Sequence, residues 1–243
     1  MVTVRQSVCK VADVSKDATI RTMRLMGASI LASALGFQAW ADLTYGTFTW
    51  GQLPGYFTPL ANLSGIVALL AAARVTRPEP RWVTLLRVNS ATYLVVVGVV
   101  YWALLAQFTT PYFPWANAIL HGGSGIILVA DWVLIGGRRR LPLASLWSVL
   151  SLPAAWVSYL LFRAFLDGWV PYPFLDPARG AAATLGTLGA IAAVGLAVSG
   201  LLRVLAVLRP RTFWPVPARA AAAHRPVEGR HAAGMSGYQP PRR

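Results

Sequence analysis

Six long apolar stretches alternate along the chain with short segments that carry charge, proline or aromatic residues. They cover residues 25–43, 58–73, 88–108, 115–136, 141–165 and 181–202. An α-helix needs about 20 mainly apolar residues to cross about 30 Å of hydrocarbon, and every stretch except the second reaches or approaches that length. The second reaches it if its helix starts before Thr58 or crosses a thinned bilayer. The pattern predicts an all-α fold, a polytopic membrane bundle of six transmembrane helices.

Lys and Arg lie almost entirely on one side of these predicted spans. That side carries the basic residues of both termini and of the connections between spans 2 and 3 and between spans 4 and 5: Arg5, Lys10, Lys16, Arg21, Arg24, Arg74, Arg77, Arg81, Arg87, Arg138, Arg139, Arg140 and those from Arg203 to Arg243. The opposite side carries Arg163 and Arg179. Because cytoplasmic loops are enriched in Lys and Arg, we expect both termini to be cytoplasmic in a multi-pass protein of the cell membrane.

The same pattern divides the chain into three parts. Residues 1–20 are mixed and charged, and we expect a cytoplasmic segment that precedes a retained first span and forms at most a short surface helix. Residues 21–208 hold the six predicted spans. Residues 209–243 are rich in Pro, Arg, Ala and Gly, a composition that cannot bury a core and predicts a disordered basic tail.

Charge and cysteine content exclude several classes of function. The formal net charge is +14, but the basic residues lie in short loops and tails beside apolar spans, where they suit anionic lipid headgroups. We therefore expect membrane lipids as partners and no nucleic acid, since no nucleic-acid recognition fold accompanies the charge. Cys9 is the only cysteine, so neither a disulfide within the chain nor a thiolate metal site is expected, and no cofactor is indicated.

Three predicted spans carry pairs of polar residues at one depth, near the non-cytoplasmic side. The pairs are Gln38 with Asp42, Thr58 with Asn62, and Asn117 with His121. Each pair is spaced by four residues, which places both members on one face of a helix. Polar groups in hydrocarbon need a partner or a function. We therefore take Thr58 and His121 as candidate catalytic residues and Asn62, Asn117, Asp42 and Gln38 as candidate substrate-binding residues.

Thr58 allows two interpretations. It precedes Pro59 at the start of a helix, and a threonine N-cap followed by proline at the first helical position is a common arrangement. Alternatively, Thr58 is a nucleophile. Its hydroxyl then needs an adjacent base such as histidine, and the free N–H groups of the helix start could receive an oxyanion.

His121 is the only histidine in the predicted membrane domain, and histidine is the usual general base near neutral pH. The other interpretation is a structural hydrogen bond to Asn117, a neighbouring helix or water. If a carboxylate orients the imidazole, Asp42 or Asp176 is the better candidate. A metal site is not indicated, because one histidine supplies too few ligands.

A second polar layer lies at the cytoplasmic depth, with Asn89, Ser90 and Asp131. Asp131 lies ten residues after His121, about 15 Å along a helix, so it cannot orient that imidazole. We expect Asp131 to pair with Arg87 or another arginine of this layer. In the last span, the small residues Gly186, Gly189, Gly195 and Gly200 predict close helix packing.

Three segments carry a resemblance to a known family. They are Tyr56-Phe57-Thr58 at the start of the second span, Asn117 to Asp131 in the fourth, and the sequence WVPYPFLD at 169–176 before the sixth. In order and placement they resemble the androgen-induced-gene family of six-span membrane proteins, and more closely its uncharacterised actinobacterial relatives, over most of residues 20–205. Animal members hydrolyse branched fatty acid esters of hydroxy fatty acids with an intramembrane threonine and histidine. The resemblance implies that these are Thr58 and His121.

Two functions therefore stand side by side. One is an intramembrane threonine hydrolase of lipid (fatty acid) esters that uses a Thr58–His121 pair. The other is a non-catalytic membrane protein that binds lipid or a partner subunit. A Thr58 hydroxyl within reach of a His121 nitrogen, beside a cavity open to lipid, favours the first. A hydroxyl bonded only to its own helix favours the second. A small transporter is disfavoured, because the mid-membrane depth shows neither helix breaks nor a continuous polar stripe.

Overall fold

The computed structural model of the chain describes residues 2–45, 52–75, 78–135, 138–176 and 179–208, with side chains in the first helix from Asp17 onward. Within these residues every regular element is helical, as the sequence predicts. The α-helices are α1 (Val2–Thr44), α2 (Phe57–Arg74), α3 (Arg81–Val100), α4 (Pro114–Ala118), α5 (Ser124–Leu134), α6 (Ser151–Asp167) and α7 (Ala181–Leu208). Shorter segments have other helical pitches: 3₁₀ turns η1 (Leu53–Gly55), η3 (Ala106–Phe108), η5 (Leu143–Leu150) and η6 (Pro173–Leu175), and π-turns η2 (Tyr101–Leu105) and η4 (Ile119–Gly123).

Five helical stretches are long and apolar enough to cross a membrane, which indicates a multi-pass integral membrane protein. They are Phe57–Arg74, Arg81–Phe108, Pro114–Leu134, Leu143–Asp167 and Ala181–Leu208. These stretches correspond to the second to sixth predicted spans. The first predicted span, residues 25–43, lies in α1, which is not among the five. Gln38 and Asp42 lower the hydropathy of that part of α1.

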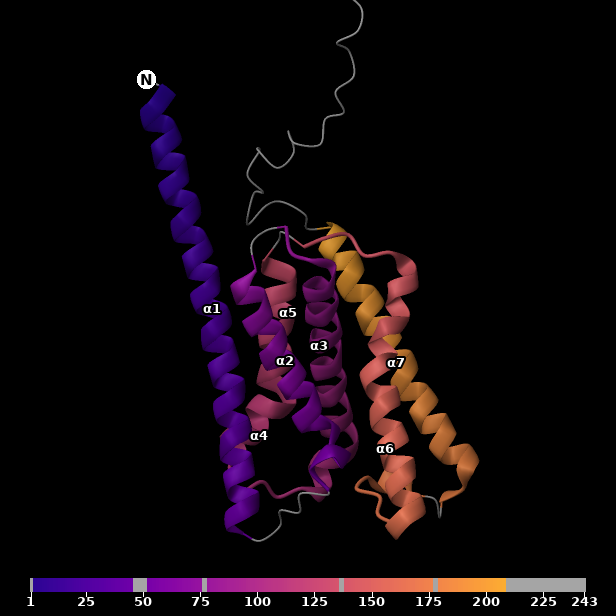
Figure 1. Cartoon of the computed structure of the whole chain (residues 1–243). Helices are drawn as coiled ribbons and strands as arrows, with labels where there is room; N and C mark the ends of the chain where they lie inside the picture. The colour runs from indigo at the N-terminus through magenta and orange to yellow at the C-terminus, as the bar shows by residue number, and fades with distance from the viewer. Residues whose placement is uncertain (1, 46–51, 76–77, 136–137, 177–178, 209–243) are drawn as a thin grey trace, which may run out of the picture.

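The N-terminal part of the chain differs from the prediction. Residues 1–20 were expected to precede the first span and to form at most a short helix. Instead, α1 is helical without a break from Val2 to Thr44, over 43 residues, or about 65 Å at 1.5 Å per residue. It extends well beyond the other helices (Figure 1). The expected boundary after residue 20 is therefore not a boundary in secondary structure, while the tail at 209–243 lies outside the described residues.

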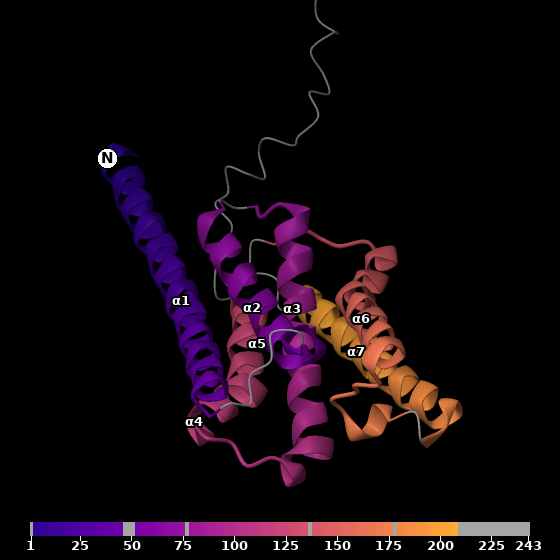
Figure 2. The same ribbon diagram turned by 60° about the horizontal axis from the view of Figure 1, so that its bottom comes forward.

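The core lies among α1, α2, α3 and α5, which pack side by side (Figures 1 and 2). Each of these helices contributes one leucine that is 1 % exposed or less: Leu31, Leu69, Leu94 and Leu128. Gly65 of α2 lies among three of them, and a Cβ there would lie 2.9 Å from Leu94 Cδ1. A side chain at this position would therefore force the Leu94 side chain to move within a packed core.

The helices α6 and α7 lie on the other side of α3 (Figure 2). α7 packs along α3 and η5, and the Trp132 indole N–H donates to the Leu202 carbonyl at 2.7 Å. The small residues of α7 do not serve the expected close packing. A Cβ at Gly186, Gly189 or Gly200 would meet nothing within 4 Å, and Gly195 alone of the four approaches another side chain, Val96. These Cβ contacts are those with the residues that the structure describes.

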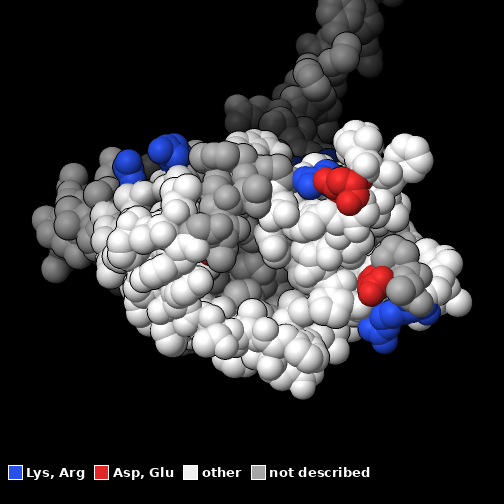
Figure 3. Space-filling view, turned by 90° about the horizontal axis from the view of Figure 1, so that it is seen from below, with Lys and Arg blue, Asp and Glu red and all other residues white. Residues whose placement is uncertain are grey.

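The helices run up and down, so the described loops gather at two ends. The lower end in Figure 1 contains the start of α2 and the end of α6, and the upper end contains the end of α2 and the start of α3. Seen from below, the described surface consists mostly of residues other than Lys, Arg, Asp and Glu (Figure 3). The candidate site lies toward this lower end, and a buried cluster of charges lies toward the upper one.

Candidate functional site

Thr58 and His121 meet across two segments of the bundle. Thr58 is the second residue of α2, and His121 is the middle residue of the π-turn η4. Thr58 Oγ1 lies 3.2 Å from His121 Nε2, within hydrogen-bond distance. Both residues are half-buried. The Thr58–Asn62 pair and the Asn117–His121 pair, which the sequence placed at one depth, are thus in contact. The contact is made by Thr58 and His121, the candidate nucleophile and base.

The helix α2 begins two residues earlier than the capping interpretation requires. Its first helical residue is Phe57, and its N-cap is Tyr56, which has an extended backbone and makes no side-chain capping bond. The prediction of a Thr58 N-cap with Pro59 at the first helical position is therefore wrong. Pro59 is the third residue, where the first turn tolerates proline because it needs no intrahelical N–H bond. The Thr58 hydroxyl contacts His121 instead of capping its own helix.

One backbone donor of this first turn remains beside the hydroxyl. The first N–H groups of a helix have no intrahelical acceptor. Here the Tyr56 N–H donates to the Leu53 carbonyl at 3.2 Å, the Phe57 N–H donates to the Tyr172 hydroxyl at 2.9 Å, and Pro59 has no N–H. Among the described residues of this first turn, the Thr58 N–H is therefore the backbone donor that can bind an anion. The positive end of the helix dipole favours negative charge at the same point.

Aromatic residues from α6 and from the distant segment before α7 hold the start of α2. Tyr172 accepts from Phe57 N–H, and the Trp156 indole N–H donates to the Gly55 carbonyl at 2.9 Å. A Cβ at Gly55 would collide with the Trp169 ring. Burial raises the pKa of Tyr172 to about 12, so its phenol stays neutral at physiological pH. The segment at 169–176 thus fixes the position from which Thr58 projects.

The hydrogen-bond network assigns the tautomer of His121. Its Nδ1 lies 3.1 Å from the Asn117 backbone carbonyl. A carbonyl only accepts, so Nδ1 carries the proton, and in a neutral imidazole Nε2 then presents its lone pair. Nε2 faces the Thr58 hydroxyl, which is the arrangement of a general base. Asp42 and Asp176 were the candidates if a carboxylate oriented the ring, but Nδ1 contacts a backbone carbonyl instead.

The four other predicted site residues fall into two groups. Asn62 is fully buried, and its Nδ2 donates to the Thr58 carbonyl at 2.9 Å and the Leu120 carbonyl at 3.1 Å, which ties α2 to η4. The Asn117 side chain donates to the Tyr101 hydroxyl at 2.8 Å. On α1, Gln38 Nε2 donates to Asp42 Oδ1 at 3.0 Å. The structure therefore gathers Asn62 and Asn117 around Thr58 and His121, while Gln38 and Asp42 bond to each other on α1.

The sequence reasoning missed the contribution of the third span. The ring of Tyr101, in the π-turn η2, stacks on the His121 imidazole with centroids 3.7 Å apart and planes 20° from parallel. The Trp102 indole N–H donates to the His121 carbonyl at 3.1 Å. Regular helices were expected at this depth, and the two π-turns are local changes of pitch within chains that stay helical. A π-turn has no sequence signature, although Gly98, one turn before Tyr101, is a signal of close helix approach.

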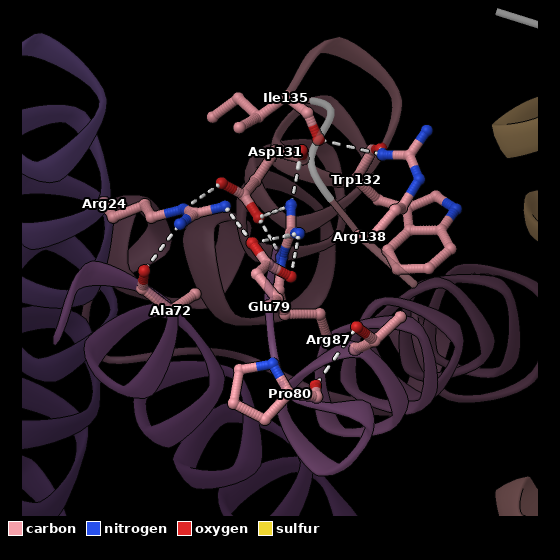
Figure 4. A network of polar contacts seen from close by, with 10 residues as sticks. Arg24, Ala72, Glu79, Pro80, Arg87, Asp131, Trp132, Ile135 and Arg138 are labelled. Carbon is pink, nitrogen blue, oxygen red and sulfur yellow. Dashed lines mark hydrogen bonds and ion pairs between the residues drawn. The ribbon is translucent and has the colours of Figure 1, made fainter. Parts of the chain in front are cut away.

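Asp131 of the second polar layer belongs to a buried cluster of four charges (Figure 4), whereas Asn89 bonds to Ser148 and Ser90 to Ser64. Asp131 accepts from Arg24 Nε and Arg87 Nε, each at 2.8 Å, so the expected pairing of Asp131 is confirmed. Glu79 was missed, because it lies in a proline turn that reads as an exposed loop. It is fully buried and accepts from Arg87 Nη1 at 2.8 Å and Arg24 Nη2 at 3.1 Å. Two cations and two anions thus neutralise one another.

Arg138 lies beside this cluster and caps the C-terminal end of α5, which finishes at Leu134. Its guanidinium donates to the carbonyls of Trp132 and Ile135 and stacks over the Trp132 ring at 4.6 Å from the centroid. Burial, together with the charge of Arg87, lowers the pKa of Arg138 to about 10. Arg138 therefore satisfies the terminal carbonyls of α5, where a cation suits the helix dipole.

A cavity of about 430 Å³ opens between α2, α3 and the start of α6. Its lining is mostly apolar, with Ser64, Asn89, Tyr93 and Ser151 among the leucine and valine side chains. Neither Thr58 nor His121 lines this cavity, so it is not the lipid-open cavity whose presence beside the pair would favour a hydrolase. Within the described residues no three His, Cys, Asp or Glu side chains group as metal ligands.

Comparison with known proteins does not extend this description. No protein-family model matches the chain, and neither a curated protein nor a solved structure matches it.

Proposed function

We propose that the protein is an intramembrane threonine hydrolase that cleaves carboxylic esters of lipids, with Thr58 as nucleophile and His121 as general base. The observation that carries this proposal is the 3.2 Å separation between Thr58 Oγ1 and His121 Nε2. The Nδ1 contact with the Asn117 carbonyl supports the tautomer that a base requires. The resemblance of the chain to the androgen-induced-gene family suggests the same two residues for the same roles.

The proposed reaction has two steps. In the first, Thr58 Oγ1 attacks the ester carbonyl carbon while His121 Nε2 takes the hydroxyl proton. The Thr58 N–H stabilises the negative charge on the carbonyl oxygen. When the tetrahedral intermediate collapses, the C–O bond to the alcohol breaks and His121 returns the proton to the leaving oxygen. In the second step, His121 deprotonates a water molecule that attacks the acyl-threonine carbonyl carbon. The bond from that carbon to Thr58 Oγ1 then breaks, His121 returns the proton to Oγ1, and the carboxylic acid leaves.

The surroundings of the pair suit a lipid ester. Thr58 begins a helix that is apolar enough to span a membrane, and His121 lies within another such stretch. A substrate with long acyl chains partitions into that layer, whereas a charged soluble ester does not. The half-buried Thr58 and His121 allow approach of the ester group. Membrane lipids are therefore both the proposed surroundings and the proposed source of substrate.

The same proposal includes the topology. We infer six spans in the cell membrane, with α1 as the first and both termini cytoplasmic, because the basic residues gather on one side of the apolar stretches. Reporter domains fused to each terminus test this orientation. Both should resist external protease in intact spheroplasts, and digestion of either one would contradict it.

A non-catalytic role remains the second candidate, and one observation favours it. Asn62 donates to the Thr58 and Leu120 carbonyls and so joins α2 to η4 without any chemistry. In that role Thr58 and His121 would add one more link between the same segments, in a protein that binds lipid or a partner subunit.

Activity labelling separates the two candidates. The purified protein in detergent is treated with a fluorophosphonate probe, which reacts with activated hydroxyl nucleophiles. The wild type is compared with Thr58→Ala, His121→Ala and the control Thr109→Ala, whose exposed hydroxyl donates to the Leu105 carbonyl. Labelling of the wild type and of Thr109→Ala, with none in the other two folded variants, supports the hydrolase. Absence of labelling in a folded wild type favours the non-catalytic protein.

A further inference from the structure

Tyr101, Asn117 and His121 form a closed set of contacts at the proposed site. The Asn117 backbone carbonyl accepts from His121 Nδ1 at 3.1 Å, and its side-chain Nδ2 donates to the Tyr101 hydroxyl at 2.8 Å. The Tyr101 ring then stacks on the imidazole, with centroids 3.7 Å apart. Asn117 thus fixes both the edge of the imidazole and the ring that covers its face.

From this geometry we infer that Tyr101, held by Asn117, is a positioning residue that keeps His121 Nε2 directed at Thr58. The inference rests on the proposed hydrolase. An imidazole turns about χ2 in a broad energy well, and one hydrogen bond to a carbonyl restricts that rotation only in part. A stacked ring removes this freedom. Reaction geometry is sensitive to such freedom, because a misplacement of about 1 Å can slow a reaction by about 10²-fold.

The burial of Tyr101 and Asn117 supports this assignment. Tyr101 is 4 % exposed and Asn117 is 9 % exposed, whereas Thr58 and His121 are half-buried. Tyr101 and Asn117 are therefore shielded from the surroundings, and the accessible surface of the site belongs to Thr58 and His121. Asn117, a candidate substrate-binding residue from the sequence, acts in this arrangement on the imidazole instead of on the substrate.

The backbone reinforces the same arrangement. Tyr101 and Trp102 are consecutive residues of η2, so one contacts the imidazole ring while the next donates to the His121 carbonyl at 3.1 Å. A Cβ at Gly98 would lie 2.9 Å from that carbonyl oxygen. α3 can approach η4 this closely because residue 98 is glycine. A π-turn changes the direction of successive side chains relative to a regular helix, which brings Tyr101 onto the ring.

The tautomer and mobility of His121 give a test that does not depend on catalysis. The protein is labelled with ¹⁵N-histidine, and the His121 signals are assigned by their loss in His121→Gln, since His224 and His231 lie in the tail. The wild type should show one population with a protonated Nδ1 and an unprotonated Nε2. Tyr101→Leu should show mixed tautomers or exchange broadening. Tyr101→Phe keeps the stacked ring and should stay close to the wild type.

A matched control is available at the same end of the molecule. Tyr112 is also a stacked tyrosine, with its ring 4.3 Å from that of Tyr45, but it is exposed. Tyr112→Leu should therefore leave the His121 signals unchanged. Should Tyr101→Leu fail to fold, Tyr101→Met serves in its place, because it also removes the stacked ring and keeps a large apolar side chain.

Fluorophosphonate labelling rates complete the test. Tyr101→Leu should label about 10²-fold more slowly than the wild type, with Tyr101→Phe restoring most of the rate. Unchanged His121 signals and an unchanged rate in folded Tyr101→Leu would overturn the inference and leave the hydrolase intact. Disturbed His121 signals in Tyr101→Leu, together with no labelling of the wild type, would support the positioning role and reject the hydrolase.

Discussion

Thr58 differs from five other described threonines in what its hydroxyl contacts. The hydroxyls of Thr84, Thr92, Thr109, Thr184 and Thr187 each donate to the carbonyl four residues earlier, at 2.8 to 3.4 Å. Within a helix that local bond satisfies a hydroxyl and keeps it from other chemistry. Thr58 lies in the first turn of α2, where no helical carbonyl precedes it. Its hydroxyl is therefore the one that contacts an imidazole.

The hydroxyl group of Thr58, and not the volume of its side chain, should decide activity. Thr58→Val keeps the volume but removes the nucleophile, so fluorophosphonate labelling should disappear. Thr58→Ser keeps the hydroxyl beside His121 and should still label. Labelling that persists in folded Thr58→Val would indicate that another residue is the nucleophile.

His121 should act as a base in a measurable way. His121→Gln removes the proton acceptor and should slow labelling by about 10²- to 10⁴-fold, the usual contribution of a general base. The thermal stability of the detergent-solubilised variant is the control. An unchanged labelling rate would exclude His121 as the base.

The free energy of unfolding should depend on pH through the bond between Tyr172 and the start of α2. Burial raises the pKa of Tyr172 from 10.0 to about 12. A raised pKa in the folded state means that the stabilisation by the neutral phenol is complete below pH 10 and is lost as pH rises through about 12. Tyr172→Phe leaves the Phe57 N–H without its acceptor and should lower the free energy of unfolding by about 1–3 kcal/mol. Denaturation curves in detergent should show that the difference between wild type and variant shrinks between pH 10 and 12.

At the scale of elements, the site depends on departures from regular helix. The turns η2 and η4 are both π-helical, and they contact each other through Tyr101 and His121. π-turns occur frequently at functional sites because they redirect side chains. The close approach of α3 to η4 at Gly98 is the packing feature on which this contact depends.

Gly98→Ala tests whether the site needs the close approach of α3 to η4. The new Cβ would lie 2.9 Å from the His121 carbonyl oxygen, and because that atom is backbone, η4 must move. Overpacking of this kind costs about 1–3 kcal/mol, and the labelling rate should fall with the displaced imidazole. Gly186→Ala is the matched control, since its Cβ meets nothing within 4 Å. That variant should keep its activity and gain slightly in stability through helix propensity.

At the scale of the whole molecule, the buried charge cluster joins segments that are distant in sequence. Arg24 comes from α1, Glu79 from the segment before α3, Arg87 from α3 and Asp131 from α5 (Figure 4). Their ion pairs span 2.5 to 3.1 Å. Arg24 also donates to the Ala72 carbonyl at the end of α2 at 2.6 Å. The cluster therefore ties together α1, α2, α3 and α5 toward the upper end, whereas the site lies toward the lower end.

Removal of one charge from this cluster should be far more harmful than removal of a pair. Arg87→Met leaves buried carboxylates uncompensated and should destabilise the protein by about 3–5 kcal/mol. Arg87→Met combined with Glu79→Met leaves Arg24 paired with Asp131 and should recover much of that loss. Arg163→Ala, at the exposed pair with Asp167, should change the melting temperature little. A double variant no more stable than Arg87→Met would show that neutrality is not what the cluster requires.

The sequence by itself determined the features that follow from local composition. Apolar stretches of membrane-spanning length gave the helical class and five spans, because each helix satisfies its own backbone hydrogen bonds in lipid whatever its neighbours are. Four-residue spacing placed Thr58 with Asn62 and Asn117 with His121. The pairing of Asp131 with an arginine followed from the cost of an isolated charge in this layer.

Only the tertiary structure decided which groups meet. Helix rotation and pitch depend on packing against other helices, so the stack of Tyr101 on His121 and the burial of Glu79 have no local signal. The start of α2 at Phe57 depends on Tyr172, which lies 115 residues further along the chain. The expected N-cap at Thr58 and the expected packing of the α7 glycines failed for this reason. Local spacing places a residue on a face, but the contact that gives that face a function is made by another part of the chain.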